Sequence, residues 1–381
     1  MEGQIDFHGR PLIASGTRKG KTMARCEIGL QMWPWYSIKT LLEHATRALE
    51  LYPYDQIWMC DHFEYEDSLT ILSAMAMKLD TSVGTMVTYP HRNPLESAQK
   101  FSSIAGLLHE GRQVSAGIGA GGAVPAQIFK EKAAPVAVME ETVCFLTSLL
   151  AGEKVEFKRF PMLSQRFRYE EQYTAKLFFP PEPPVPVYVA AGGPRMFDLA
   201  GRVGDGVILT QLNPWTSFAG IKQGMFQQAV EMVSTGVQSR EKGGTFKKIY
   251  NLHISVSRDG EKARQWAKRN TSYGLAGSLM RYPEVLKATG VDLEAVRTVR
   301  EAYAKGLGVD EATRRVSDGL LEDAGFIVAG TPDEVLERCA LILPRVRSFG
   351  VDQLVIGVPL GPDVPEALGL IAKEIIPALV L

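Results

Sequence analysis

The sequence lacks an excess of charge of either sign, a set of paired cysteines and any long apolar run. Its 381 residues include 42 lysines and arginines against 43 aspartates and glutamates, so nothing favours nucleic acid or a membrane as a partner. The four cysteines (Cys26, Cys60, Cys144 and Cys339) form no CxxC pair. This argues against a disulfide framework or a metal site and indicates reduced thiols in a cytoplasmic protein. No apolar run approaches the ~20 residues that cross a bilayer.

The first 23 residues lack the features of a secretory signal. They carry several charged side chains and contain no apolar stretch followed by a cleavage motif. Regular patterning begins only near Ala24. We therefore expect residues 1–23 to be a flexible extension and residues 24–381 to form a single domain.

What the sequence does contain is a regular alternation of apolar runs and amphipathic stretches. Eight runs rich in valine and isoleucine are nearly continuous in hydrophobicity, as strands buried on both faces should be. They are residues 26–32, 56–60, 82–88, 113–119, 185–191, 206–209, 250–255 and 353–358. Helical spacing is found in residues 38–51, 95–108, 138–150, 196–203 and 332–343. Eight strand–helix repeats predict an α/β protein with a (β/α)8 TIM barrel, and a doubly wound open sheet is the alternative.

Two connections are too long for simple strand–helix units. Residues 151–184 include the proline-rich stretch 180–184, and residues 266–325 are rich in helix-forming side chains. In a barrel, such extra segments wall the active-site mouth or build a subunit interface. We expect helical insertions at the mouth, with the working residues at the carboxyl ends of the strands.

Two polar residues, Asp61 and His62, follow directly after the second apolar run. Imidazole titrates near neutral pH and can move a proton to or from a reacting hydroxyl or amine. A rim histidine that only caps a turn is the alternative. Glu64 and Glu66 follow in the same loop, so a carboxylate could orient His62 or act in its place.

Two further strand ends are rich in glycine. Gly119 and Gly121 follow the fourth run, where the absence of a Cβ lets a ligand approach the backbone, although the segment is not a dinucleotide fingerprint. After the fifth run, the Gly-Gly-Pro sequence at 192–194 leads into a helix whose first N–H groups would face a phosphate. Arg195 could add donors. A plain tight turn is the alternative.

Taken in order, several segments resemble the F420-dependent branch of the luciferase-like family. They are residues 54–62, 83–94, 192–206, 328–335 and 357–363. Within that branch the chain is similar to methylene-tetrahydromethanopterin reductases and to F420-dependent glucose-6-phosphate dehydrogenases. The resemblance implies a homodimeric barrel that acts on a small-molecule substrate, with coenzyme F420 in the barrel mouth.

The resemblance also implies roles for individual residues. It places a non-proline cis peptide between Met86 and Val87, behind the deazaflavin ring. His62 matches the catalytic histidine, and Asp61 matches a residue that contacts the ring or fixes that histidine; Glu64 is a further catalytic candidate. The expected cofactor-binding residues are Asp61, Met86, Val87, Thr88, Gly119, Gly121, Ala191, Gly192, Gly193 and Arg195, and no metal is expected.

Three positions depart from the family pattern. Gly122 stands where the reductase and the dehydrogenase have an acidic residue, and Gln31 stands in place of the reductase's glutamate. Residues 210–214 lack the lysine with which the sugar dehydrogenase holds a phosphate. These departures argue against glucose 6-phosphate and against the pterin as substrates.

The predicted function is hydride transfer between F420 and an organic substrate, namely a ketone or alcohol, an imine or an enone. Two alternatives remain: an FMN-dependent monooxygenase on the same fold, and a cofactor-binding relative without enzymatic activity. A deazaflavin carries two electrons and activates oxygen poorly, so the first two predict different chemistry. The Gly-Gly-Pro turn and the Asp61–His62 pair favour F420. Aromatic residues near the mouth, such as Trp33 and Tyr89, predict a pocket with aromatic walls.

Overall fold

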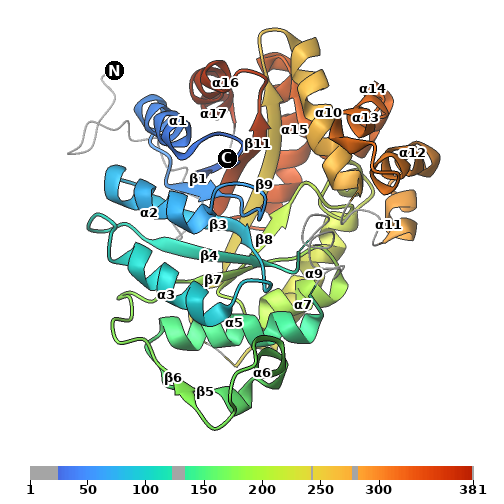
Figure 1. Ribbon diagram of the computed structural model, residues 1–381. Helices are drawn as coiled ribbons and strands as arrows, with labels where there is room; N and C mark the ends of the chain where they lie inside the picture. Colours follow the sequence, from blue (N-terminus) through green and yellow to red (C-terminus); the bar gives the residue numbers. More distant parts are fainter. Residues whose placement is uncertain (1–24, 122–133, 242, 277–281, 380–381) are drawn as a thin grey trace, which may run out of the picture.

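The computed structural model describes residues 25–121, 134–241, 243–276 and 282–379 (Figure 1). The expected flexible extension at residues 1–23 and the departure at Gly122 both lie outside the described residues. Among the helices of the described ranges, none has the length and apolar character needed to cross a membrane.

Eight parallel strands close into a barrel. They are β1 (Glu27–Met32), β2 (Gln56–Met59), β3 (Ser82–Thr88), β4 (Val114–Gly119), β7 (Val187–Ala190), β8 (Gly206–Thr210), β9 (Lys247–Val256) and β11 (Gln353–Leu360). Each strand pairs with the next in that order, and β11 closes the ring by pairing with β1, where Gly29 lies opposite Val355. All eight predicted strands are confirmed. Because the sheet is closed, the alternative of a doubly wound open sheet is excluded.

The strands are buried on both faces, which explains their continuous hydrophobicity. Every residue of β2 and of β4 is buried. Inside the barrel, Trp58 of β2 packs in one cluster with Tyr188 of β7 and Ile208 of β8. On the outside, the strands pack against the helices in a second and larger cluster. Because neither face of these strands is turned to solvent, their sequences do not alternate between apolar and polar residues.

Helices surround the barrel (Figure 1). They are α1 (Ile38–Leu51), α2 (Ser68–Lys78), α3 (Pro94–Ala105), α5 (Val136–Leu150), α7 (Pro194–Val203), α8 (Phe218–Lys222), α9 (Met225–Gln238), α10 (Gly260–Ala276), α15 (Pro332–Ser348) and α16 (Val364–Leu370), followed by η3 (Ile371–Ile375) and α17 (Ile376–Ala378). The five predicted helices are confirmed. Their starts are capped locally: Ser37 accepts a hydrogen bond from the Thr40 N–H at α1, and Thr331 and Glu334 form a capping box at α15.

The first long connection lies on the outer side of the barrel. It forms a two-stranded antiparallel sheet, β5 (Val155–Glu156) and β6 (Thr174–Ala175), with η1 (Phe157–Arg159) and α6 (Pro161–Phe167) between them. Its aromatic side chains stack on Phe145 of α5. In contrast to the expectation for both insertions, no described residue of this segment lines the cavity at the mouth, because its apolar side chains are used against α5.

The second long connection reaches the barrel mouth. After α10 it forms α11 (Pro283–Ala288), α12 (Leu293–Ala304), α13 (Gly308–Arg314) and α14 (Asp318–Ala324). These helices have a small apolar core of their own and lie at the right and upper right of Figure 1, whereas α6 lies at the bottom. The chain then adds a strand that the sequence did not predict, β10 (Val328–Gly330), which pairs with the end of β9.

Candidate active site

A cavity of about 280 Å³ opens at the carboxyl ends of the barrel strands. Its walls come from the ends of β1, β2, β3, β4, β7, β8 and β9, together with α10 and Tyr282. This is the end of the barrel at which a site was expected. The described residues that line the cavity include no lysine, arginine, aspartate or glutamate.

One wall of the cavity contains the end of β3. Met86 and Val87 line it and are joined by a non-proline cis peptide bond, which confirms that implication of the family resemblance. Gly119 and Gly121 line the cavity from β4 and the loop that follows it. A Cβ on Gly119 would lie only 2.7 Å from Cγ2 of Val87. Glycine therefore allows the two strand ends to pack closely into a smooth, apolar wall.

The adjoining wall comes from the turn after β7. Ala191, Gly192 and Gly193 line the cavity there. A Cβ on Gly192 would lie 2.8 Å from Nδ2 of Asn213, so the turn is tightly packed. Gly193 is the N-cap of α7, and no side chain caps this helix. The first turn of α7 can thus offer backbone N–H groups to an anionic part of a ligand, whereas Arg195 is exposed and does not line the cavity.

Asp61 lies beneath the cavity wall and does not line it. Its side chain has no exposed surface. Its two oxygens accept hydrogen bonds from Arg92 at 2.6 and 2.7 Å and from the Thr88 hydroxyl at 2.6 Å. Arg92 also forms an ion pair with Asp67 at 2.9 Å. The structure thus places Asp61 and Thr88, both expected to bind the cofactor, in an ion-pair network that joins the end of β2 to the loop after β3.

His62 does line the cavity. Its ring packs on the indole of Trp33, with centroids 4.6 Å apart, and meets the ring of Tyr65 edge-on. Its Nδ1 is buried without a hydrogen-bond partner. Burial lowers the pKa of His62 to about 4, although the charge of Asp61 acts in the opposite direction. At neutral pH the imidazole is therefore uncharged.

The two glutamates of this loop lie elsewhere. Glu64 is exposed and does not line the cavity. Glu66 is also exposed, and its carboxylate accepts a 2.6 Å hydrogen bond from the N–H of Ile38 at the start of α1. Neither carboxylate lines the cavity, whereas His62 does.

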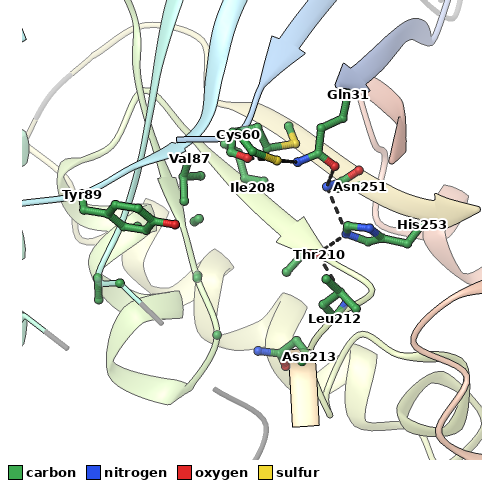
Figure 2. Close-up of a pocket in the computed structure, with 18 of the residues that line it drawn as sticks. Gln31, Cys60, Val87, Tyr89, Ile208, Thr210, Leu212, Asn213, Asn251 and His253 are labelled. Atoms are coloured by element: carbon green, nitrogen blue, oxygen red, sulfur yellow. Dashed lines mark hydrogen bonds between the residues drawn. The ribbon is translucent and has the colours of Figure 1, made fainter. Parts of the chain in front are cut away.

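The floor of the cavity is a connected set of uncharged polar side chains (Figure 2). Nε2 of Gln31 donates to the carbonyl of Met86 and to Sγ of Cys60, both at 3.0 Å. Its Oε1 accepts from the Asn251 amide at 2.9 Å. The same amide lies 3.2 Å from Nε2 of His253. Gln31 is thus tied to the end of β3 through its donor group, which a glutamate at that position would not supply.

His253, at the end of this network, adopts one defined tautomer. The carbonyl of Val358 lies 2.7 Å from Nδ1 and can only accept, so Nδ1 carries the proton. Nε2 then accepts from the Thr210 hydroxyl at 2.9 Å (Figure 2). Complete burial lowers the pKa of His253 to about 4. Both imidazoles of the cavity are therefore neutral at pH 7.

Sequence reasoning singled out Gln31 in this floor but missed Asn251 and His253. Asn251 and His253 are two positions apart on β9, so their side chains share one face of the strand. Two polar residues on one face of an otherwise apolar run could have indicated an inward-facing polar cluster. In the described part of the chain, no group of histidine, cysteine or carboxylate side chains is arranged to hold a metal ion.

Comparisons with known proteins identify the family to which this barrel and its cavity belong. A family model described as luciferase-like monooxygenase matches residues 23–347. The chain is 31% identical to a 5,10-methylenetetrahydromethanopterin reductase of Archaeoglobus fulgidus, over 89% of this chain and 95% of that protein. It is 28% identical to an F420-dependent glucose-6-phosphate dehydrogenase of Amycolatopsis mediterranei, over 90% of this chain and 94% of that protein.

A solved structure agrees with the fold. The coenzyme F420-dependent tetrahydromethanopterin reductase from Methanopyrus kandleri superposes with a TM-score of 0.71. The match covers 93% of this chain and 100% of that one, at 23% sequence identity. At this identity the likeness concerns the arrangement of the barrel and its helices.

Proposed function

Because this chain belongs to the luciferase-like monooxygenase family, we propose that it transfers a hydride between coenzyme F420 and an uncharged organic substrate. The observation that carries the proposal is the composition of the cavity wall. Residues expected to hold the cofactor, from β3 (Met86, Val87), from β4 and its loop (Gly119, Gly121) and from the turn at 191–193, meet in one cavity.

This wall fits a deazaflavin in two respects. The side chains of Met86 and Val87, with the backbone of Gly119, offer an apolar surface to a flat ring. The uncapped first turn of α7 at Gly193 offers backbone donors to the anionic part of the cofactor. When bound, the deazaflavin supplies a two-electron hydride carrier that activates oxygen poorly.

The chain's own residues determine how the proton moves. Oxidation of an alcohol releases a hydroxyl proton, and the neutral imidazole of His62 can accept it. Reduction of a ketone needs a proton donor instead, and the low pKa of His62 makes its protonated form scarce at pH 7. The neutral form of His62 therefore suits alcohol oxidation.

The substrate proposed here is uncharged. The described walls of the cavity provide neither a cation for a phosphate or carboxylate nor an anion for an ammonium group, and burying an unpaired charge there would be costly. The polar floor of Gln31, Asn251 and His253 is neutral as well. A ketone, an enone or a secondary alcohol meets this requirement, whereas a sugar phosphate does not.

Calorimetric titration with F420 and with FMN tests the cofactor assignment. We expect F420 to bind at least about tenfold more tightly than FMN, a difference of about 1.4 kcal/mol in binding free energy. Gly193→Val, which would crowd Tyr282 at the start of α7, is expected to weaken F420 binding. Tight FMN binding with no F420 binding would instead support the monooxygenase alternative.

A further inference from the structure

Helix α10 carries a buried amide that has no hydrogen-bond partner among the described residues. The side chain belongs to Asn270, which is 3% exposed and lines the cavity. Within the described ranges, neither its Nδ2 nor its Oδ1 has a partner. Buried polar groups are nearly always paired, because an unpaired one loses its hydration without compensation. Asn270 is not used by the floor network or by the cofactor wall.

Near α10, two other polar atoms of residues that line the same cavity have no hydrogen-bond partner among the described residues. They are Nε1 of Trp33 and Nδ1 of His62, both buried, and the two rings pack against each other. A third such atom, Oδ1 of Asn251, belongs to the polar floor. Contacts hold α10 against this corner: the rings of Trp35 and Trp266 meet at 6.1 Å, and Arg269 lies over Trp35. Unpaired donors and acceptors thus gather where α10 meets the ends of β1 and β2.

The spacing along α10 explains why Asn270 points to this corner. Trp266, Asn270 and Tyr273 are four and three residues apart, so they lie on one face of the helix. Trp266 packs against Trp35, and Tyr273 lines the cavity with Asn270. The face is therefore turned toward the barrel mouth, with an amide between two aromatic rings.

From this geometry we propose that Asn270 is a specificity-determining residue that binds a neutral amide-like edge of the substrate, with a carbonyl and an N–H side by side. The proposal rests on the function proposed above. Asn270 Nδ2 and Trp33 Nε1 can only donate, so they fit a carbonyl oxygen, while Asn270 Oδ1 fits an N–H. A lactam or a cyclic urea presents both groups without charge.

The deazaflavin ring system itself contains an edge of this chemistry, so the source of the ligand must be assigned. The cofactor wall is formed by the ends of β3, β4 and β7. Asn270 instead lies on α10, which contacts Trp35 after β1 through Trp266 and Arg269, and it lines the cavity together with His62. We therefore assign the amide to the substrate and not to the cofactor.

The first test uses stability and needs no substrate. Asn270→Leu removes an unpaired buried amide and keeps a similar volume, so the midpoint of thermal unfolding of the free protein is expected to rise by roughly 2–4 °C. The control is Gln265→Leu on the same helix, an exposed residue whose amide bonds to Glu261; its midpoint is expected to stay within about 1 °C. A lower midpoint for Asn270→Leu would show that the amide is a structural partner and would overturn the proposal.

The second test measures binding to the F420-loaded protein. We expect 2-piperidone, a neutral lactam, to bind by calorimetry at least about tenfold more tightly than N-methyl-2-piperidone, which lacks the N–H. Asn270→Leu should abolish this difference while leaving the F420 affinity within about twofold. Equal binding of the two lactams, binding of neither, or an unchanged difference in the variant would contradict the proposal. A tenfold loss of F420 affinity would reassign Asn270 to the cofactor, whereas failure of the wild type to bind F420 would count against the proposed function itself.

Discussion

Replacing Asp61 by alanine is expected to lower the free energy of unfolding by about 3–5 kcal/mol. The carboxylate is fully buried and accepts two hydrogen bonds from Arg92 and one from Thr88. Without it, the guanidinium of Arg92, whose side chain is 17% exposed, loses its main partner, while its ion pair with Asp67 and its contact with the ring of Phe63 remain. A mostly buried charge that loses its main partner costs more than the pair itself contributes.

Urea unfolding followed by circular dichroism measures this effect, and the chain offers a matched control. Asp80 also binds an arginine through two oxygens, Arg112, but its side chain is 66% exposed. Asp80→Ala is therefore expected to cost less than about 1 kcal/mol. If Asp61→Ala costs no more than Asp80→Ala, the buried ion pair does not stabilise the barrel mouth as described. The double variant Asp61→Ala/Arg92→Met should recover part of the loss, because it removes the uncompensated charge.

Replacing His62 by alanine is expected to lower kcat for alcohol oxidation by about 10²–10⁴, the usual contribution of a general base. His62 lines the cavity and packs on Trp33, and its Nδ1 has no hydrogen-bond partner among the described residues. The F420 affinity should change little, since the cofactor wall is built from β3, β4 and the turn after β7. The control His109→Ala changes an exposed histidine and should leave kcat unchanged.

The pH profile gives an independent check on the same residue. A base must be deprotonated to act, and burial lowers the pKa of His62 to about 4. The rate of alcohol oxidation should therefore be flat between about pH 6 and 8 and fall as the pH drops toward 4. A midpoint near 6.5 would mean that His62 titrates like a solvated imidazole. A loss of less than about tenfold in His62→Ala, with the fold intact, would exclude it as the principal base.

The barrel could be predicted because each strand carries its own signal. Runs such as 82–88 are buried on both faces, so hydrophobicity alone marks them, and β3 occupies those residues. The short strand β10, with three residues, and the sheet of two-residue strands β5 and β6 have too few residues for a periodic pattern. The position of residues 151–184 against α5 depends on aromatic contacts between segments that are distant in the sequence. A local sequence pattern cannot predict such contacts.

The site was predictable where the backbone determines it. Glycines at 119, 121, 192 and 193 mark close approach of the chain to the cavity, and the structure brings them together. The role of Asp61 in an ion pair was harder to predict, because its partner Arg92 lies 31 positions further along the chain. The floor formed by Gln31, Asn251 and His253 joins β1 to β9 and becomes apparent only when the barrel closes.

The central claim, hydride transfer with F420, is tested most directly by following an isotope. Oxidised F420 is incubated anaerobically with the protein and a panel of uncharged secondary alcohols that carry deuterium on the hydroxyl-bearing carbon, and the reduced cofactor is examined by mass spectrometry. We predict the transfer of one deuterium to F420 from at least one alcohol, strongly reduced with the boiled protein. No transfer from any member of the panel, together with oxygen incorporation into a substrate when reduced FMN and O₂ are supplied instead, would contradict the account.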